Sequence, residues 1–186
     1  MSNSTALIVI DMQNGFLGEK SRHVIPSVLE LVQQFKSRGL PIVFTRFHNE
    51  PNSQYEKLIG WKRLRSSPET ELTKELVPYA ELVVDKEIYS AFTPNFAETV
   101  REKGWNTLIV CGVATDGCVL KTAVDAFERG LLPIVVEDAC SSHAGAEVHQ
   151  AGLMLIGRFI GKAQVMKTQA VLSKLDASAS SATIAT

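Results

Sequence analysis

The chain has 186 residues, of which 45% are hydrophobic, so it can bury a sizeable core but is too short for two full domains to be expected. Nineteen basic residues oppose twenty acidic ones, and the resulting charge of −1 offers no basic surface for nucleic acid or an anionic membrane. That balance favours a small molecule or another protein as the partner. The polar N-terminus and the short apolar runs argue against a signal peptide or a membrane-spanning helix, which predicts a cytoplasmic protein.

Short apolar runs, rich in β-branched residues, alternate with segments of helical spacing. The runs that predict strands are 6–10, 41–44, 81–84, 107–111, 132–136 and, more weakly, 163–166. The segments that predict helices are 24–38, 93–103, 117–129, 144–159 and 168–174. This alternation predicts one α/β domain over residues 1–175. We expect a three-layer, doubly wound, Rossmann-like sheet of about six mainly parallel strands in the order 3-2-1-4-5-6.

Two regions interrupt the alternation. Residues 49–78 are polar, contain three prolines and are longer than a structural connection requires, so we expect an excursion that covers a pocket. Residues 176–186 are rich in serine and alanine, and we expect a disordered tail there.

Three reactive side chains follow predicted strands. Asp11 comes directly after the first strand, Lys86 after the third, and Cys118 in the turn after the fourth. Open α/β sheets bind ligands at the carboxyl ends of their strands, near the point where the strand order reverses. Strands 1 and 4 are neighbours at that point in the expected order, so we expect Asp11 and Cys118 to face each other.

The turn that carries Cys118 leads from a strand through two glycines into a helix. The unpaired amides and the dipole of a first helical turn favour an anion, which predicts a lowered pKa for this thiol. A nearby Lys86 ammonium would act in the same direction, whereas Asp11 would accept the thiol proton or hold the lysine in place. The same backbone amides could bind an oxyanion.

Each of these residues also has a purely structural interpretation. Asp11 could cap the following segment, and Lys86 could be a solvated turn residue. The three cysteines show neither the even, regular spacing of a disulfide framework nor a CxxC zinc motif. Cys111, inside a predicted strand, and Cys140, in a predicted turn of small residues, are interpreted as inert core thiols. The convergence of three reactive groups on one edge of the sheet favours catalysis.

Three blocks of sequence resemble the isochorismatase-like hydrolase superfamily. They are ALIVIDMQNGF at 6–16, DKEIYSAF at 85–92, and VCGVATDGCV at 110–119 continuing to EDA at 137–139. This superfamily includes nicotinamidases, N-carbamoylsarcosine amidases, ureidoacrylate and biuret hydrolases, and isochorismatases. The blocks span most of the chain, from about residue 5 to about 175, and their order and spacing make the resemblance specific.

The resemblance implies a catalytic triad of Asp11, Lys86 and Cys118. It also implies a cis peptide between Val113 and Ala114, and an oxyanion hole made by the backbone N–H groups of Ala114 and Cys118. The reaction it implies is attack of the Cys118 thiolate on an amide or ureido carbonyl. Asp11 would carry the proton to the leaving nitrogen, and water would hydrolyse the thioester.

By the same resemblance, substrate-binding residues are expected at Phe16, Tyr89, Phe92 and Thr115, although aromatic side chains near a sheet could equally belong to the core. Metal-binding nicotinamidases carry Asp-x-His after the second strand, whereas residues 46–48 read Arg-Phe-His. We therefore expect neither a metal nor another cofactor. His48 either recognises substrate or is an ordinary loop histidine. Substrate specificity is expected to lie in 14–23, 47–65 and 141–147.

Three alternative functions remain open from the sequence. An isochorismatase-type enol-ether hydrolase shares the resemblance, although such members do not need the cysteine. A nucleotide-binding module is disfavoured, because Cys-Val at 118–119 replaces the Lys and Ser/Thr of a phosphate loop. A non-catalytic scaffold is the third. The resemblance also predicts a homo-oligomer, a dimer or tetramer, and the apolar helix 144–159 suits either a subunit contact or the core.

Overall fold

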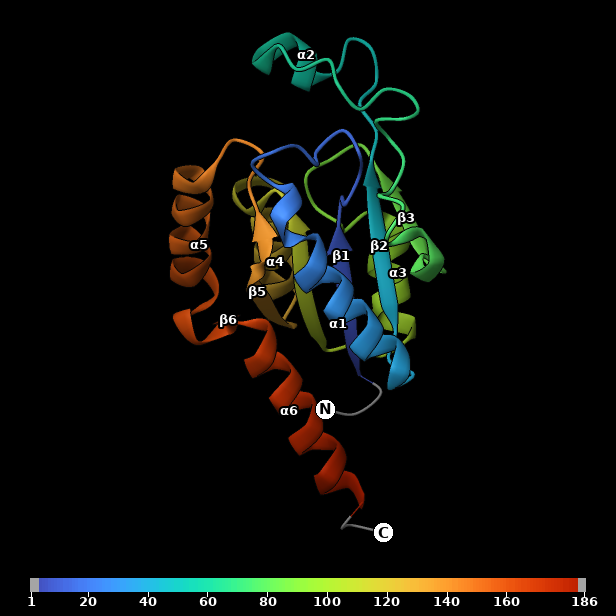
Figure 1. Cartoon of the computed structure of the whole chain (residues 1–186), viewed down its shortest axis with the longest axis vertical. Helices are drawn as coiled ribbons and strands as arrows, with labels where there is room; N and C mark the ends of the chain where they lie inside the picture. Colours follow the sequence, from blue (N-terminus) through green and yellow to red (C-terminus); the bar gives the residue numbers. More distant parts are fainter. Residues whose placement is uncertain (1–3, 184–186) are drawn as a thin grey trace.

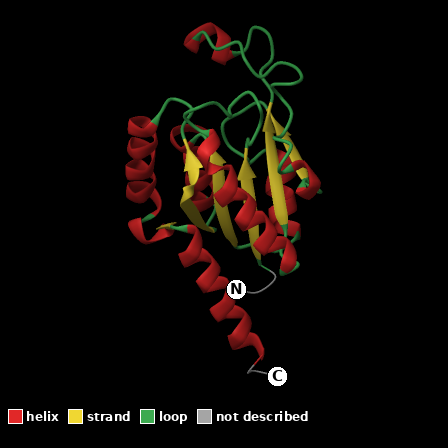
Figure 2. Ribbon diagram, in the orientation of Figure 1, coloured by secondary structure: helices red, strands yellow, loops and turns green. Residues whose placement is uncertain are grey.

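Six strands form one sheet in the computed structural model, which describes residues 4–183 and the side chains up to residue 177. The strands are β1 (Thr5–Ile10), β2 (Ile42–Phe47), β3 (Val83–Lys86), β4 (Thr107–Val113), β5 (Leu132–Ser141) and β6 (Val165–Met166). Their order is β3-β2-β1-β4-β5-β6, and every neighbouring pair is parallel. The predicted fold class and strand order are therefore confirmed, and the longer strands β1 to β5 point towards the same edge of the sheet (Figure 2).

The two central strands, β1 and β4, are buried along their whole length. Their apolar side chains point to both faces, as expected for the middle of a parallel sheet that is covered on both sides. Gly112 pairs with Ile10 at the carboxyl ends of these strands, with φ at +113°. A Cβ atom at Gly112 would lie 2.2 Å from the carbonyl oxygen of Ile10, so only glycine lets β4 approach β1 here.

Five helices cover the sheet: α1 (Ile25–Ser37), α3 (Pro94–Glu102), α4 (Leu120–Glu128), α5 (Ala146–Ile160) and α6 (Thr168–Thr183). Figure 1 shows α1 in front of the sheet and α3 and α4 behind it, which gives three layers. Shorter 3-10 turns lie at Arg22–Val24, Val77–Tyr79 and Lys162–Gln164. A π-helical turn, Thr115–Val119, joins β4 to α4.

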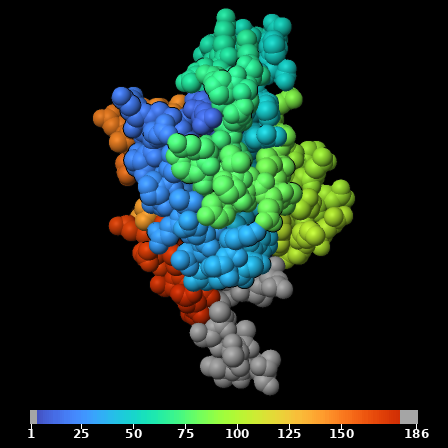
Figure 3. Space-filling view, turned by 45° about the vertical axis from the view of Figure 1, so that its right-hand side comes forward, coloured from blue at the N-terminus to red at the C-terminus, as the bar shows by residue number. Residues whose placement is uncertain are grey.

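The predicted excursion after β2 carries a short helix, α2 (Gln54–Ile59). Ser53 begins α2 by accepting a hydrogen bond from the backbone N–H of Glu56, and Gly60 ends it in the left-handed conformation. This segment lies beyond the carboxyl ends of the strands (Figure 1) and forms one end of the molecule (Figure 3). It therefore lies on the edge where the sequence predicts the active site.

The C-terminal segment differs from the sequence-based expectation. Helix α6 continues to Thr183, whereas a disordered tail was predicted for 176–186. Alanine has the highest helix propensity and occurs repeatedly in this stretch, so the polar composition does not interrupt the helix. Residues 184–186 lie outside the described part of the chain. Over residues 4–183, no helix combines the length and apolarity that crossing a membrane requires.

Candidate active site

Asp11 lies directly after β1 and is held by the neighbouring strand β2. Its backbone has a positive φ of 46°, a conformation that costs a non-glycine residue energy and that occurs most often at functional sites. The Thr45 hydroxyl donates a hydrogen bond to Asp11 Oδ1 at 2.5 Å and accepts one from the Asp11 backbone N–H at 3.1 Å. These two bonds fix the direction in which the carboxylate points.

Lys86, the last residue of β3, connects the other two members of the predicted triad. Its Nζ lies 2.7 Å from Asp11 Oδ2 and 3.4 Å from Cys118 Sγ. It also donates to the backbone oxygens of Ile88 at 3.0 Å and Tyr89 at 3.1 Å. The side chains of Asp11 and Lys86 are both fully buried, so Lys86 is not a solvated turn residue. The structure therefore brings the three residues together as predicted.

The direction of the thiol pKa differs from the prediction. Burial raises the pKa of Cys118, and the Asp11 carboxylate raises it further, whereas Lys86 acts in the opposite direction. Burial also disfavours the Lys86 ammonium, but the negative charge of Asp11 and the hydrogen bonds that Lys86 donates to Asp11 and to the sulfur outweigh this effect and raise its pKa. The resting site thus holds a protonated thiol beside a lysine–carboxylate ion pair. Sequence position alone could not reveal this, because burial depends on the surrounding fold.

The turn between β4 and α4 presents Cys118 to the pocket. The peptide between Val113 and Ala114 is cis, as the resemblance implied. The Ala114 carbonyl accepts hydrogen bonds from the N–H groups of Gly117, at 3.0 Å, and Val119, at 3.1 Å, which closes the turn around the cysteine. Both Ala114 and Cys118 line the pocket.

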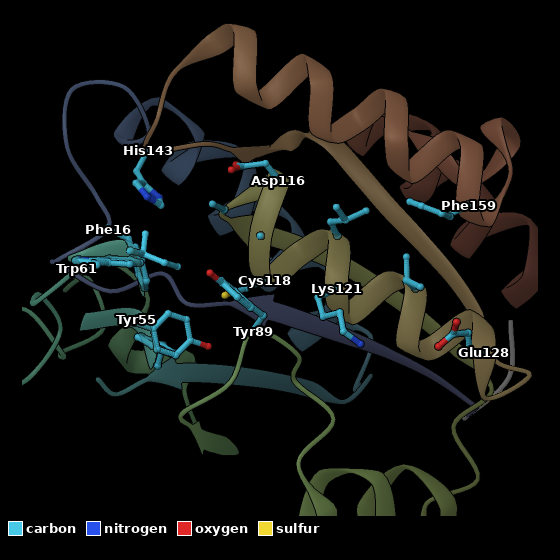
Figure 4. Close-up of a pocket in the computed structure, with 16 residues that line it drawn as sticks. Phe16, Tyr55, Trp61, Tyr89, Asp116, Cys118, Lys121, Glu128, His143 and Phe159 are labelled. Carbon is cyan, nitrogen blue, oxygen red and sulfur yellow. The ribbon is translucent and has the colours of Figure 1, made fainter. Parts of the chain in front are cut away.

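A cavity of about 730 Å³ opens in front of Cys118. Seven of its lining residues have aromatic rings: Phe16, Phe47, Tyr55, Trp61, Tyr89, His143 and Phe159. Figure 4 shows Cys118 near Tyr89, with Phe16 and Trp61 on one side and Glu128 and Phe159 on the other. The pocket is large enough for a small organic substrate and is mainly apolar.

Two of the five predicted substrate-binding residues, Phe16 and Tyr89, line this pocket. The other three are placed elsewhere. His48 lies in a separate hollow, where its Nε2 is 3.1 Å from Asp85 Oδ1. The Phe92 ring packs against Phe96 and lies under the Arg129 guanidinium. Thr115 is fully buried, and its hydroxyl is 2.8 Å from His149 Nδ1.

Other pocket residues were not identified individually from the sequence. Tyr55 and Trp61 come from the excursion, and His143 follows β5. They fall in two of the three ranges expected to set specificity, 47–65 and 141–147. Asp116 also lines the pocket. The only signal in the sequence that could have identified it is its position two residues before the proposed nucleophile. No group of three or more potential metal-binding side chains was found among the described residues.

Gly152 of α5 allows this helix to pack against the turn that carries Cys118. A Cβ atom at Gly152 would lie 2.9 Å from the backbone nitrogen of Asp116 and 3.1 Å from its Cα. We expect Gly152→Ala to lower the free energy of unfolding by about 1–3 kcal/mol, because backbone atoms must move apart. We also expect kcat to fall by roughly tenfold or more, because the nucleophile is displaced.

The matched control for this variant is Gly157→Ala, on the same helix. There the nearest atom to the added Cβ would be Cγ of the Lys162 side chain, at 3.5 Å, an ordinary contact. The gain in helix propensity is the same at both positions, so urea unfolding and steady-state kinetics of the pair isolate the steric effect. Equal behaviour of the two variants would contradict a role for Gly152 in positioning the turn.

Cys111 and Cys140 are buried thiols in the sheet, and both lie within strands rather than in a turn. Burial raises the pKa of Cys111 well above its usual value and raises that of Cys140 to about 12. Above about pH 9 the unfolded chain loses these two protons while the folded protein keeps them, so stability falls as pH rises. The expected loss is about 1.4 kcal/mol per pH unit for each thiol.

Urea unfolding at several pH values between 8 and 11 measures this dependence. The control is the double variant Cys111→Ala/Cys140→Ala, which retains every other alkaline-titrating group. Its stability is expected to fall less steeply with pH than that of the unmodified protein. Identical slopes would show that the two thiols do not keep their protons in the folded state.

Comparison with known proteins agrees with the fold and shows the family. The sequence profile of the isochorismatase domain matches residues 5–169, so the chain belongs to the isochorismatase family. It is accordingly a hydrolase of the isochorismatase-like type, and the resemblance drawn from the sequence is confirmed.

Two relatives and one solved structure illustrate this membership. The chain is 30% identical over 161 residues to nicotinamidase 3 of Arabidopsis thaliana, covering 82% of this chain and 80% of the relative. It is 28% identical over 194 residues to the ureidoacrylate amidohydrolase RutB of Acinetobacter baylyi, covering 84% and 78%. It superposes on nicotinamidase PncA from Bacillus subtilis with a TM-score of 0.78 at 28% identity, covering 88% and 99%.

Proposed function

We propose that this protein hydrolyses a C–N bond of a small amide or ureido compound, with Cys118 as the nucleophile. The observation that carries the proposal is the position of Lys86 Nζ, within hydrogen-bonding distance of both the Asp11 carboxylate and the Cys118 sulfur. Such a triad provides a nucleophile, a proton acceptor and a cation in a site from which water is largely excluded. The amidohydrolase and nicotinamidase activities named for two relatives support the same class of reaction.

The first half of the reaction forms a thioester. Asp11 accepts the thiol proton as Cys118 Sγ attacks the carbonyl carbon, and the Lys86 ammonium stabilises the developing thiolate. The backbone N–H groups of Ala114 and Cys118 donate hydrogen bonds to the resulting oxyanion. Asp11 then returns the proton to the leaving nitrogen, the C–N bond breaks, and ammonia or an amine departs.

The second half hydrolyses the thioester. Asp11, again a carboxylate, takes a proton from water as the water oxygen attacks the thioester carbon. The C–S bond breaks, and the proton passes back to the sulfur. This step yields a carboxylic or carbamic acid and restores the starting protonation of all three residues. No step requires a metal ion.

The experiment that tests this function is ammonia release from nicotinamide, N-carbamoyl amino acids, a ureidoacrylate and biuret, with EDTA present. We expect at least one compound to be hydrolysed at a rate that EDTA does not change. Failure of the whole panel, combined with hydrolysis of isochorismate, would replace amide hydrolysis by enol-ether cleavage.

We further propose that the protein is cytoplasmic, where reducing conditions preserve the Cys118 thiol.

We also propose that the protein self-associates through α5. Met154 and Phe159 of this helix are 70% and 52% exposed, and Phe127 of α4 is 51% exposed. Neighbouring apolar side chains of this size favour a subunit contact. Light scattering is expected to give a dimer or tetramer, and Met154→Glu is expected to shift it towards the monomer. Leu58→Glu, on α2, is the exposed control; a monomeric starting protein would reject the contact.

A further inference from the structure

Asp116 places an uncompensated negative charge in the wall of the pocket. The residue lies in the turn Thr115–Val119, two positions before the nucleophile, and lines the cavity. Its Oδ1 atom is buried and accepts no hydrogen bond from any group in the described part of the chain. Burying part of a carboxylate without a partner is unfavourable, so this oxygen is available to a ligand that supplies a hydrogen-bond donor or a positive charge.

Three basic residues around the pocket are already paired with other acids, whereas Lys20, in a neighbouring hollow, donates a hydrogen bond to the Ala144 carbonyl oxygen at 3.2 Å. Lys86 is bound to Asp11, and Lys121, which lines the same pocket, is paired with Asp125. Arg63 lines a neighbouring hollow, where it forms an ion pair with Glu69 at 2.8 Å. Among residues 4–177, no ion pair of Asp116 is found.

The position of Asp116 is rigidly determined. It lies at the start of the helical segment that continues into α4, where the helix dipole stabilises a negative charge. Gly152 of α5 packs against its backbone, which leaves the turn little room to move. The carboxylate is therefore a fixed feature of the pocket.

Aromatic rings stand beside this carboxylate. The ring centroids of Phe16 and Trp61 are 5.3 Å apart, and each lies 5.5 Å from that of His143. Figure 4 shows His143 and Asp116 on one side of the pocket, with Phe16 and Trp61 next to His143. Aromatic faces attract cations, most strongly in a site with little water.

His143 does not supply a positive charge to this part of the pocket. Burial lowers its pKa, and Arg63 lowers it further, although Asp116 acts in the opposite direction. At neutral pH the imidazole is therefore uncharged and acts as part of the aromatic wall. A carboxylate on the substrate would meet Asp116, and the only lysine or arginine among the described residues lining this pocket, Lys121, is paired with Asp125.

We infer that this end of the pocket recognises a positively charged organic group on the substrate, such as a protonated amine. Asp116 is the counter-charge, and the rings of Phe16, Trp61 and His143 form the face against which the cation packs. Asp116 is thus a specificity-determining residue. The inference rests on the proposed function, because it assumes that the amide of the same molecule reaches Cys118.

The test uses the Cys118→Ala protein, so that binding is measured without turnover. Three probes of matched size differ in charge: 4-(aminomethyl)benzamide is a cation, 4-methylbenzamide is neutral, and 4-carbamoylbenzoate is an anion. Isothermal titration calorimetry at pH 7 is expected to show the cation binding about tenfold more tightly than the neutral probe, and the anion more weakly than both. Adding Asp116→Asn is expected to remove the tenfold preference while leaving binding of the neutral probe unchanged.

Glu128→Gln, at the far end of the same pocket, is the charge-matched control and is expected to keep the preference. Binding of the anion as tightly as the cation, binding of none of the probes, or equal effects of Glu128→Gln and Asp116→Asn would each overturn the assignment. Ammonia release by the unmodified protein is measured separately. Cation-selective binding without amide hydrolysis would reject the proposed function and leave the cation site standing.

Discussion

Cys118→Ala is expected to reduce ammonia release to the uncatalysed background, a loss of roughly 10⁴-fold or more, because no other group can form the thioester. The sulfur is the atom that Lys86 Nζ approaches at 3.4 Å, and it lies at the pocket in which substrate is proposed to bind. Substrate affinity is expected to change little, since the alanine side chain leaves the pocket walls intact. Steady-state kinetics and calorimetry on the same preparation separate these two effects.

Two further measurements strengthen this test. Acid quenching of the unmodified enzyme during turnover, followed by intact-protein mass spectrometry, is expected to show the added mass of the acyl group. The matched control is Cys140→Ala, which removes a buried thiol of β5 outside the pocket lining and is expected to keep kcat within about twofold. A Cys118→Ala enzyme that retains its rate would rule out covalent catalysis by this residue.

Lys86→Met is expected to lower the free energy of unfolding by about 3–5 kcal/mol at neutral pH, because it leaves the buried Asp11 carboxylate without its cation. Both side chains are fully buried, and the ion pair is 2.7 Å long. Activity is expected to be lost as well, since the developing thiolate loses the adjacent positive charge. Urea unfolding followed by fluorescence measures the stability change.

The double variant Asp11→Asn/Lys86→Met removes both charges and is expected to recover much of the lost stability but none of the activity. Asp85→Asn provides the exposed counterpart. Its carboxylate pairs with Arg46 at 2.8 Å but is about half exposed, so its removal is expected to cost less than about 1 kcal/mol. Similar losses for Lys86→Met and Asp85→Asn would show that burial does not govern the energetics of the triad.

The sequence by itself determined the sheet and the edge of the sheet at which Asp11, Lys86 and Cys118 meet. The β-branched runs around β1 and β4 predict strands buried on both faces, and alternation with helices restricts the topology to very few parallel sheets. The strand order then places Asp11 beside the turn that carries Cys118. These features are predictable because each strand shows the same local pattern of buried residues and is joined to the next strand by the same kind of connection.

The pocket and the protonation of its groups were decided only by the tertiary structure. Tyr55, Trp61 and His143 come from irregular segments without periodicity, so no pattern could show which of their side chains turn towards Cys118. For the same reason, the structure places His48 outside the pocket.

The raised pKa of Cys118 has a similar origin. The sequence shows the helix start and the nearby lysine, both of which favour the thiolate. Only the fold shows how completely the thiol is buried, and this burial, together with the charge of Asp11, dominates. Desolvation and charge proximity depend on distances between segments far apart in the chain, which only the folded structure defines.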